Sequence, residues 1–165
     1  MKLLSLLSGI LILLLSACAQ KDATFFPSSN TLYFNSFETS DETRGLDHYL
    51  IKEDAPKKGG KHSLSICGGC IVPSFELDAF MTLSEDTPVK LKLWGKTDAG
   101  MTGAISLVVD GNLIVFIDIE SSKWKAYESE TVIIPANQPI QFFFYSGGFV
   151  PVTTYYDMIE VVKDF

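Results

Sequence analysis

The sequence predicts an all-β domain of the antiparallel β-sandwich class. Apolar residues recur with period two in short runs, and clusters of Gly, Asp, Asn, Ser and Pro separate these runs. No window of about eleven or more residues keeps the 3.6-residue period of a helix. The spacing leaves room for about eight to ten strands, which is typical of two packed sheets.

The first three runs are each expected to bury one face, because side chains alternate across a strand. The inward residues are Leu32 and Phe34 in residues 31–35, Leu64 and Ile66 in residues 63–66, and Val89, Leu91 and Leu93 in residues 89–94.

Residues 104–119 predict a β-hairpin. Asp110-Gly111-Asn112 marks its turn, since Asp-Gly readily adopts the positive φ that tight hairpin turns need. The inward residues are Ile105, Leu107 and Val109 on one arm and Leu113, Val115, Ile117 and Ile119 on the other. Later runs predict strands in residues 124–134, 140–145 and 154–162, with Pro135 and Gly147-Gly148 between them.

Length and charge limit the class of protein. A chain of 165 residues with a net charge of −7 fits one folded domain and does not favour nucleic acid as a partner. The densest basic cluster, Lys57, Lys58 and Lys61, is interrupted by glycines and is interpreted as a solvated turn.

The N-terminal residues carry an export signal. Leu15-Ser16-Ala17-Cys18 resembles the lipobox of bacterial lipoproteins, which receive lipid on the cysteine. Lys2 and the apolar run from Leu3 to Leu15 precede it, and this run is shorter than the ~20 residues of a membrane-spanning helix. The alternative is an ordinary secretory peptide that leaves Cys18 free.

The resemblance to lipoproteins divides the chain into a signal peptide (1–17), a lipidated tether (18–30) and a β-sandwich domain (31–165). It implies attachment to a membrane of the bacterial envelope through acyl chains on Cys18. Ala19 follows the cysteine, and the absence of Asp at this position favours the outer membrane.

Five segments taken in order resemble the jelly-roll carbohydrate-binding modules and their galactose-binding-like relatives. The segments are Phe37-Glu38, residues 58–66 (KGGKHSLSI), residues 89–96 (VKLKLWGK), residues 124–127 (WKAY) and residues 155–161 (YYDMIEV). This resemblance implies a jelly-roll sandwich that binds a glycan. The sequence departs from the family pattern at Met158, which stands where the closing motif has a second Asp.

The same resemblance implies a structural Ca²⁺ ion that ties the first strand to the last. Glu38 and Asp157 match the carboxylate ligands, and backbone oxygens near Gly60 and Lys61 would complete the shell of six to eight oxygens. The alternative is that Glu38 is a solvated turn residue and Asp157 caps a strand end.

Aromatic residues predict the ligand-binding surface. Alternation places Trp94 on the face of its strand that carries Lys90, Lys92 and Lys96. It also places Phe143 and Tyr145 opposite Phe142 and Phe144, and Phe116 with Asp118 and Glu120. We expect Trp94, Phe143 and Tyr145, with Lys92 as a polar partner, to line one groove that packs against a sugar ring. The alternative is that these are ordinary surface aromatics.

Cys67 and Cys70 enclose two glycines and predict a structural disulfide. A β-turn brings its first and fourth Cα atoms within ~7 Å, which suits a disulfide. A redox role would need the first cysteine at a helix N-terminus, whereas a strand precedes Cys67. Zinc would need two more ligands, and the spacing of His48 and His62 does not supply them.

The sequence contains none of the GxSxG, HExxH, GxGxxG or phosphate-loop motifs. We therefore expect a non-enzymatic, lipid-anchored glycan-binding protein. The alternative is a structural or protein-interaction lipoprotein that has the same sandwich and binds no sugar.

Overall fold

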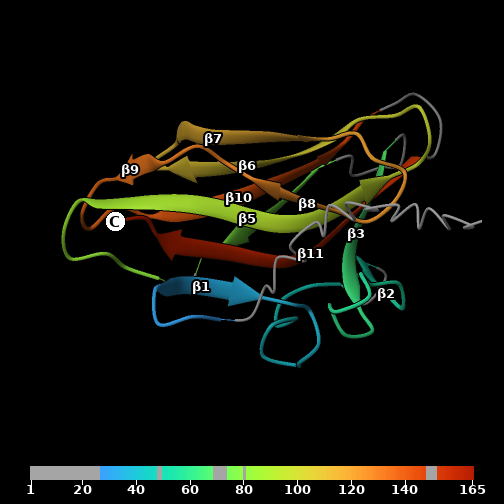
Figure 1. Ribbon diagram of the computed structural model, residues 1–165, viewed down its shortest axis with the longest axis horizontal. Helices are drawn as coiled ribbons and strands as arrows, with labels where there is room; N and C mark the ends of the chain where they lie inside the picture. The colour runs from blue at the N-terminus through green and yellow to red at the C-terminus, as the bar shows by residue number, and fades with distance from the viewer. Residues whose placement is uncertain (1–26, 48–49, 69–73, 80, 148–151) are drawn as a thin grey trace, which may run out of the picture.

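The computed structural model describes residues 27–47, 50–68, 74–79, 81–147 and 152–165 (Figure 1). These residues form eleven strands. They are β1 (Thr31–Asn35), β2 (Ile51–Lys52), β3 (Ser63–Gly68), β4 (Ser74–Asp78), β5 (Thr87–Thr97), β6 (Gly103–Val109), β7 (Asn112–Ile119), β8 (Lys125–Glu128), β9 (Val132–Ile134), β10 (Ile140–Ser146) and β11 (Val152–Lys163).

The strands form two antiparallel sheets that pack face to face (Figure 1). Sheet A has seven strands in the order β2-β3-β11-β5-β8, with β1 also paired to β11 and β9 to β5. Sheet B has four strands in the order β4-β10-β6-β7. This arrangement confirms the predicted all-β antiparallel sandwich.

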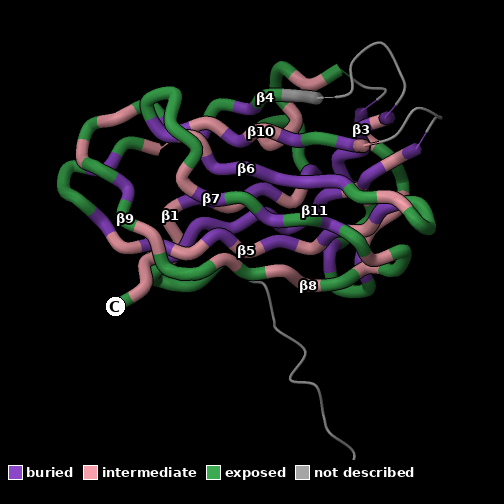
Figure 2. Tube along the Cα trace, turned by 90° about the horizontal axis from the view of Figure 1, so that it is seen from above, coloured by how far each residue is buried: buried purple, intermediate pink, exposed green. Residues whose placement is uncertain are grey.

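The core lies between the two sheets and follows the period-two pattern. Every second residue of β5 is buried, and Figure 2 shows buried positions along β5, β6 and β11. Rings from the two sheets meet in this layer: the centroids of Tyr33 and Phe142 lie 5.1 Å apart, and those of Phe144 and Tyr156 lie 5.0 Å apart. Burial of each such side chain contributes about 1.5–3 kcal/mol.

Residues 31–35 form β1 as predicted, but the prediction of its inward face was wrong. Tyr33 and Asn35 are buried, whereas Leu32 and Phe34 are half-buried. Asn35 is tolerated inside because its amide donates to the Glu42 carbonyl at 3.0 Å and its side-chain oxygen accepts from the Phe37 N–H at 2.9 Å.

Strands β6 and β7 form the predicted hairpin, in which Asp110 and Gly111 both have positive φ. Leu113, predicted to face inward, is 60% exposed. The pairing register shifts between Leu107 and Val108, and such a bulge moves the residues beyond it to the other face. The other residues that we predicted to be inward in this hairpin are buried.

The segment 124–134, predicted as one strand, forms two strands that both pair with β5. At the break between them, the Ser129 hydroxyl accepts the N–H of Leu91 at 3.0 Å, and the Ser129 N–H donates to the Leu91 carbonyl at 2.9 Å. A side chain therefore replaces one step of the strand pairing. The sequence pattern did not predict β2 and β4.

The predicted signal peptide (1–17) and Cys18 lie outside the described residues, as does most of the tether (18–30). Within the described ranges, no helix is long and apolar enough to span a bilayer.

Candidate functional site

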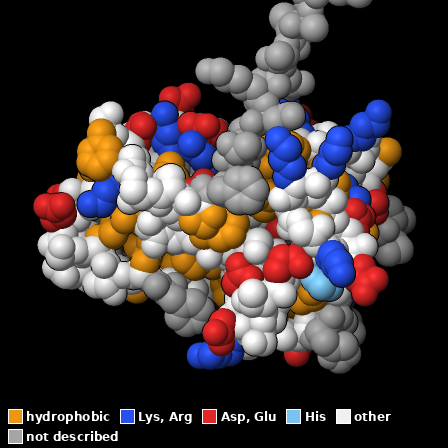
Figure 3. Space-filling model, turned by 60° about the horizontal axis from the view of Figure 1, so that its bottom comes forward, with side chains coloured by type: hydrophobic (Ala, Val, Ile, Leu, Met, Phe, Trp, Pro, Cys, Tyr) orange, Lys and Arg blue, Asp and Glu red, His pale blue; other side chains and the backbone are white. Residues whose placement is uncertain are grey.

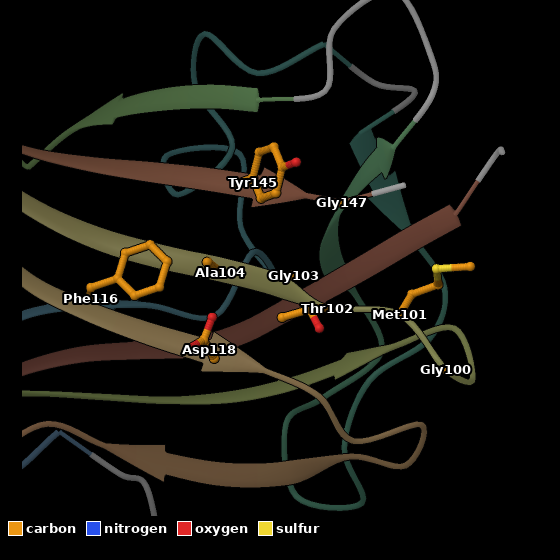
Figure 4. Close-up of a pocket in the computed structure, with 9 residues that line it drawn as sticks. All are labelled: Gly100, Met101, Thr102, Gly103, Ala104, Phe116, Asp118, Tyr145 and Gly147. Carbon is orange, nitrogen blue, oxygen red and sulfur yellow. The ribbon is translucent and has the colours of Figure 1, made fainter. Parts of the chain in front are cut away.

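The outer face of sheet B carries a shallow groove of about 360 Å³ (Figure 4). The strand register places Tyr145 of β10, Ala104 of β6 and Asp118 of β7 side by side. Neighbouring strands lie ~4.8 Å apart, so Tyr145 and Asp118 stand about 10 Å apart on either side of the small Ala104. The other lining residues are Gly100, Met101, Thr102, Gly103, Phe116 and Gly147.

A second row of side chains continues this face along the strands. Phe143 of β10, Ser106 of β6 and Phe116 of β7 are cross-strand neighbours, and Glu76 of β4 flanks Phe143. Phe116 is 55% exposed and Tyr145 is 45% exposed. The central strand thus presents small side chains between two strands that carry aromatic rings, which makes the surface concave.

Tyr156 of sheet A supports the groove from below. Its side chain is fully buried, and its hydroxyl lies 2.8 Å from the carbonyl oxygen of Ala104 and 2.5 Å from that of Tyr145. Burial raises the pKa of Tyr156, so the hydroxyl keeps its proton and donates. The backbone beneath the groove is therefore anchored to the core on both β6 and β10.

Gly103 allows the two sheets to approach at the end of the groove. A Cβ atom at this position would lie 2.3 Å from the Thr154 side chain of β11. Only glycine fits so close a contact without moving one of the sheets.

The structure separates the predicted ligand-binding residues into two groups. Phe143 and Tyr145 lie on the outer face of sheet B, whereas Trp94 and Lys92 lie on the outer face of sheet A. The prediction that they line one groove was wrong, because the core separates the two faces. Individual ligand contacts of these four residues remain predictions.

The face of sheet A near Trp94 is lined by side chains that contact one another. Trp94 is half-buried, and Lys92 Nζ lies 3.9 Å from Glu128. Lys96 forms an ion pair with Asp54, and its Nζ lies 4.5 Å from the ring centroid of Tyr155.

A second feature, separate from the groove, is a pair of carboxyl groups, Glu38 and Asp157, from segments far apart in the sequence. Glu38 follows β1, and its Oε1 accepts the backbone N–H groups of Lys61 and His62, both at 2.6 Å. Its Oε2 lies 3.1 Å from Nδ1 of His62. Burial opposes ionisation of Glu38, but these hydrogen bonds outweigh it and lower the pKa of Glu38. Figure 3 shows acidic, basic and histidine side chains gathered on this side of the molecule.

Asp157 of β11 is fully buried. Its Oδ1 accepts the Met158 N–H at 2.7 Å, and its Oδ2 has no hydrogen-bond partner among the described residues. Burial raises the pKa of Asp157 to about 8, and the nearby charges of Glu38 and Glu42 act in the same direction. A buried carboxylate oxygen without a donor is the arrangement expected where a cation binds.

Two consecutive glycines bring these carboxyl groups together. A Cβ on Gly59 would lie 2.3 Å from Asp157 Oδ2, and a Cβ on Gly60 would lie 2.5 Å from the Glu38 carboxyl group. Gly60 also has a φ of +95°. Both carboxyl groups therefore pack directly against the backbone of this turn.

The residues present fit a calcium ion rather than a transition metal. No group of three or more His, Cys, Asp and Glu within the described ranges is arranged to bind a metal. Ca²⁺ accepts backbone carbonyl oxygens beside one or two carboxylates, so Glu38, Asp157 and the glycine turn are a suitable donor set.

The departure at Met158 has a structural counterpart. Met158 has a φ of +49° and sits where the pairing of β11 with β5 is irregular, between Asp157 and Glu160. Such a conformation is uncommon for a bulky residue. It turns the Met158 N–H toward the Asp157 side chain, and so fixes one oxygen of that carboxyl group.

No family model matches the sequence, and no curated protein matches it. Solved structures do match. The CBM22-1–GH10 modules of an endo-1,4-β-D-xylanase from Clostridium thermocellum, complexed with xylohexaose, align with a TM-score of 0.56 and 15% identity. That alignment covers 84% of this chain and 29% of the xylanase chain. The N-terminal cellulose-binding domain of β-1,4-glucanase C from Cellulomonas fimi aligns with a TM-score of 0.51 and 15% identity, over 70% of this chain and 88% of that one.

The domain has the fold of a carbohydrate-binding module. At this identity the likeness shows the fold alone, and the chain spans less than a third of the xylanase chain that it matches.

Within this carbohydrate-binding-module fold, sequence reasoning identified the aromatic residues of the groove but not its floor. Ala104 and Thr102 carry no motif, and Asp118 looks like a solvated strand residue beside Phe116. The cross-strand register brings them together. The predicted Cys67–Cys70 disulfide stays a prediction, because Cys70 lies outside the described residues.

Proposed function

We propose that the protein is a lipid-anchored, non-catalytic glycan-binding protein of the bacterial cell envelope, and that the glycan lies in the sheet B groove. The observation that carries this proposal is the pair of exposed rings, Tyr145 and Phe116, on either side of the floor formed by Ala104. A pyranose ring has an apolar C–H face and hydroxyl groups at its rim. The groove offers the matching surface, with aromatic rings beside the polar groups of Asp118, Thr102 and Tyr145.

The comparisons support the same function at the level of the fold. One matching structure contains bound xylohexaose and another is a cellulose-binding domain. These structures come from a xylanase and a glucanase, whose names refer to polysaccharides. We therefore propose a polysaccharide or oligosaccharide as the ligand class.

One structural Ca²⁺ ion is part of this proposal. Glu38 and Asp157 would hold it together with backbone oxygens of the turn that contains Gly59 and Gly60. A bound ion would link the loop after β1 to β11. Its positive charge would balance the buried Asp157 carboxylate, whose Oδ2 has no hydrogen-bond partner among the described residues. The ion would therefore stabilise the fold and would not take part in binding the glycan.

Lipidation of Cys18 gives the proposed anchor and has its own test. Cys18→Ser should move the protein from the detergent phase to the aqueous phase in detergent phase separation, because the acyl chains provide the membrane affinity. Ala17→Gly, which keeps a small residue before the cysteine, should remain in the detergent phase. Equal partitioning of wild type and Cys18→Ser would contradict lipid anchoring, and the density of the membrane fraction that holds the wild type would test the outer-membrane assignment.

Aromatic substitutions test the groove. The full chain in neutral detergent should bind at least one soluble polysaccharide from a panel of β-glucan, arabinoxylan, glucomannan and galactomannan. Tyr145→Ala or Phe116→Ala should weaken this binding at least tenfold, since each removes a ring that packs on the sugar. Binding is measured as retardation in native gels that contain the polysaccharide.

Two further variants control for surface effects. Ile133→Ala removes an apolar side chain that is 56% exposed on β9 of sheet A, and it should leave retardation unchanged. If Trp94→Ala abolishes binding while Tyr145→Ala does not, the glycan binds the other face. A folded protein that binds no glycan would favour the structural or protein-interaction lipoprotein.

A further inference from the structure

Charged side chains are divided unequally between the two sheets. The four strands of sheet B carry no Lys or Arg, and their only ionisable acids are Glu76, Asp78 and Asp118. The strands of sheet A carry the lysines Lys52, Lys90, Lys92, Lys96, Lys125 and Lys163. The face that bears the groove is therefore acidic, while the basic side chains of the strands belong to the opposite sheet.

The acids beside the groove are not neutralised by the described residues. Asp118 lines the groove, and Glu76 flanks Phe143 in the adjoining row (Figure 4 shows Asp118 below Ala104). Both are exposed, and no described lysine or arginine forms an ion pair with either. Lys90 and Lys96, in contrast, lie within ion-pair distance of acids of their own region, Asp164 and Asp54.

From this charge distribution we infer that the groove takes a glycan without carboxylate or sulfate groups, and that Asp118 sets this preference. The inference rests on the proposed glycan-binding function and names its ligand class. The Asp118 carboxylate accepts hydrogen bonds from sugar hydroxyls but offers no donor to an anionic group. An anionic substituent within about 6 Å of it is disfavoured on the order of tenfold at low ionic strength, at a dielectric constant between those of protein and water.

Matched polysaccharides test this preference. The full chain in neutral detergent is assayed by biolayer interferometry against immobilised hydroxyethylcellulose and carboxymethylcellulose, which share a backbone. The same assay compares galactomannan with its C6-oxidised, carboxylated form. In 10 mM NaCl we expect each carboxylated member to bind at least tenfold more weakly than its neutral counterpart. In 300 mM NaCl the difference should shrink, because the screening length falls below the size of the groove.

Two variants with the same change of charge separate Asp118 from the overall charge of the protein. Asp118→Asn should reduce the ratio of neutral to carboxylated affinity severalfold, because it removes the charge. The ratio is the readout, since Asp118 also accepts hydrogen bonds from neutral sugars. Asp110→Asn alters an exposed residue at the far hairpin turn, where Asn tolerates the positive φ, and it should leave the difference unchanged.

Three other outcomes would contradict the inference or the function on which it rests. Equal or tighter binding of the carboxylated members would overturn the inference while leaving glycan binding intact. Equal effects of the two variants would overturn the role of Asp118. Absence of binding to every polysaccharide, neutral or carboxylated, would contradict the proposed function itself.

Discussion

Calcium should raise the melting temperature of chelator-treated protein by about 5–10 °C. A free ion concentration ~100 times the dissociation constant stabilises a folded state by about 2.7 kcal/mol, and each kcal/mol shifts a domain of this size by about 2–4 °C. The physical reason is the buried Asp157 carboxylate, whose Oδ2 has no described donor and which lies near the Glu38 charge. Differential scanning fluorimetry with EDTA and with roughly 1 mM excess Ca²⁺ measures the shift.

Asp157→Asn should abolish the calcium response, because it replaces a charged ligand oxygen with a neutral amide. Asp110→Asn, the same change at an exposed turn, should retain the full response. Superimposable melting curves of the wild type with EDTA and with Ca²⁺ would remove calcium from the proposal, and Glu38 and Asp157 would then be structural residues only.

The stability of the metal-free protein should fall as the pH rises from about 4 to 8. Asp157 ionises near pH 3.8 in the unfolded chain, whereas burial raises its pKa to about 8 in the folded protein. Between these values, unfolding releases a proton, so a higher pH favours the unfolded state with a slope of about 1.4 kcal/mol per pH unit. This contribution is fully present below pH 3.8 and is lost once the pH passes 8.

Neighbouring acids contribute in the opposite direction and in a different pH range. Hydrogen bonds outweigh burial at Glu38 and Glu42 and lower the pKa of each, so their stabilisation is lost as the pH falls below about 4.5. His62 also lies beside Glu38, so several titratable groups lie in this region. Because Asp157→Asn removes only the Asp157 carboxyl group, comparing this variant with the wild type isolates its contribution.

Urea denaturation at a series of pH values in metal-free buffer measures this dependence. The slope between pH 4.5 and pH 8 should flatten in Asp157→Asn and, in the wild type, on addition of Ca²⁺, because a bound cation keeps the carboxylate ionised. Asp110→Asn should follow the metal-free wild type. An unchanged slope in Asp157→Asn would contradict a strongly raised pKa at this position.

The period-two pattern was sufficient for the fold because burying alternate residues of many short strands requires two facing layers. Its prediction of which face is buried was least reliable where a polar side chain is satisfied inside the core or where the strand register shifts. Asn35 faces inward because backbone groups of the adjoining loop satisfy its amide, and Leu113 faces outward because a shift of register separates it from the buried Val115. Neither effect leaves a trace in the hydrophobic pattern.

The candidate site was also only partly predictable from the hydrophobic pattern. Alternation placed Phe143 and Tyr145 on an outer face, and that face contains the groove. It also placed Trp94 and Lys92 on an outer face, but alternation within a strand does not indicate which sheet the strand joins. The proposed calcium ligands came from resemblance, and only the folded chain shows that Gly59 and Gly60 hold Glu38 and Asp157 against one turn.

By itself, the sequence determined the class of fold and the outward position of the aromatic residues, because each depends on residues close together along the chain. Only the tertiary structure decided which outward faces coincide. It placed Tyr145 beside Ala104 and Asp118, moved Trp94 to the opposite surface, and left one Asp157 oxygen without a described donor. The physical reason is that strand order and register are set by packing across the whole core, and no local pattern encodes them.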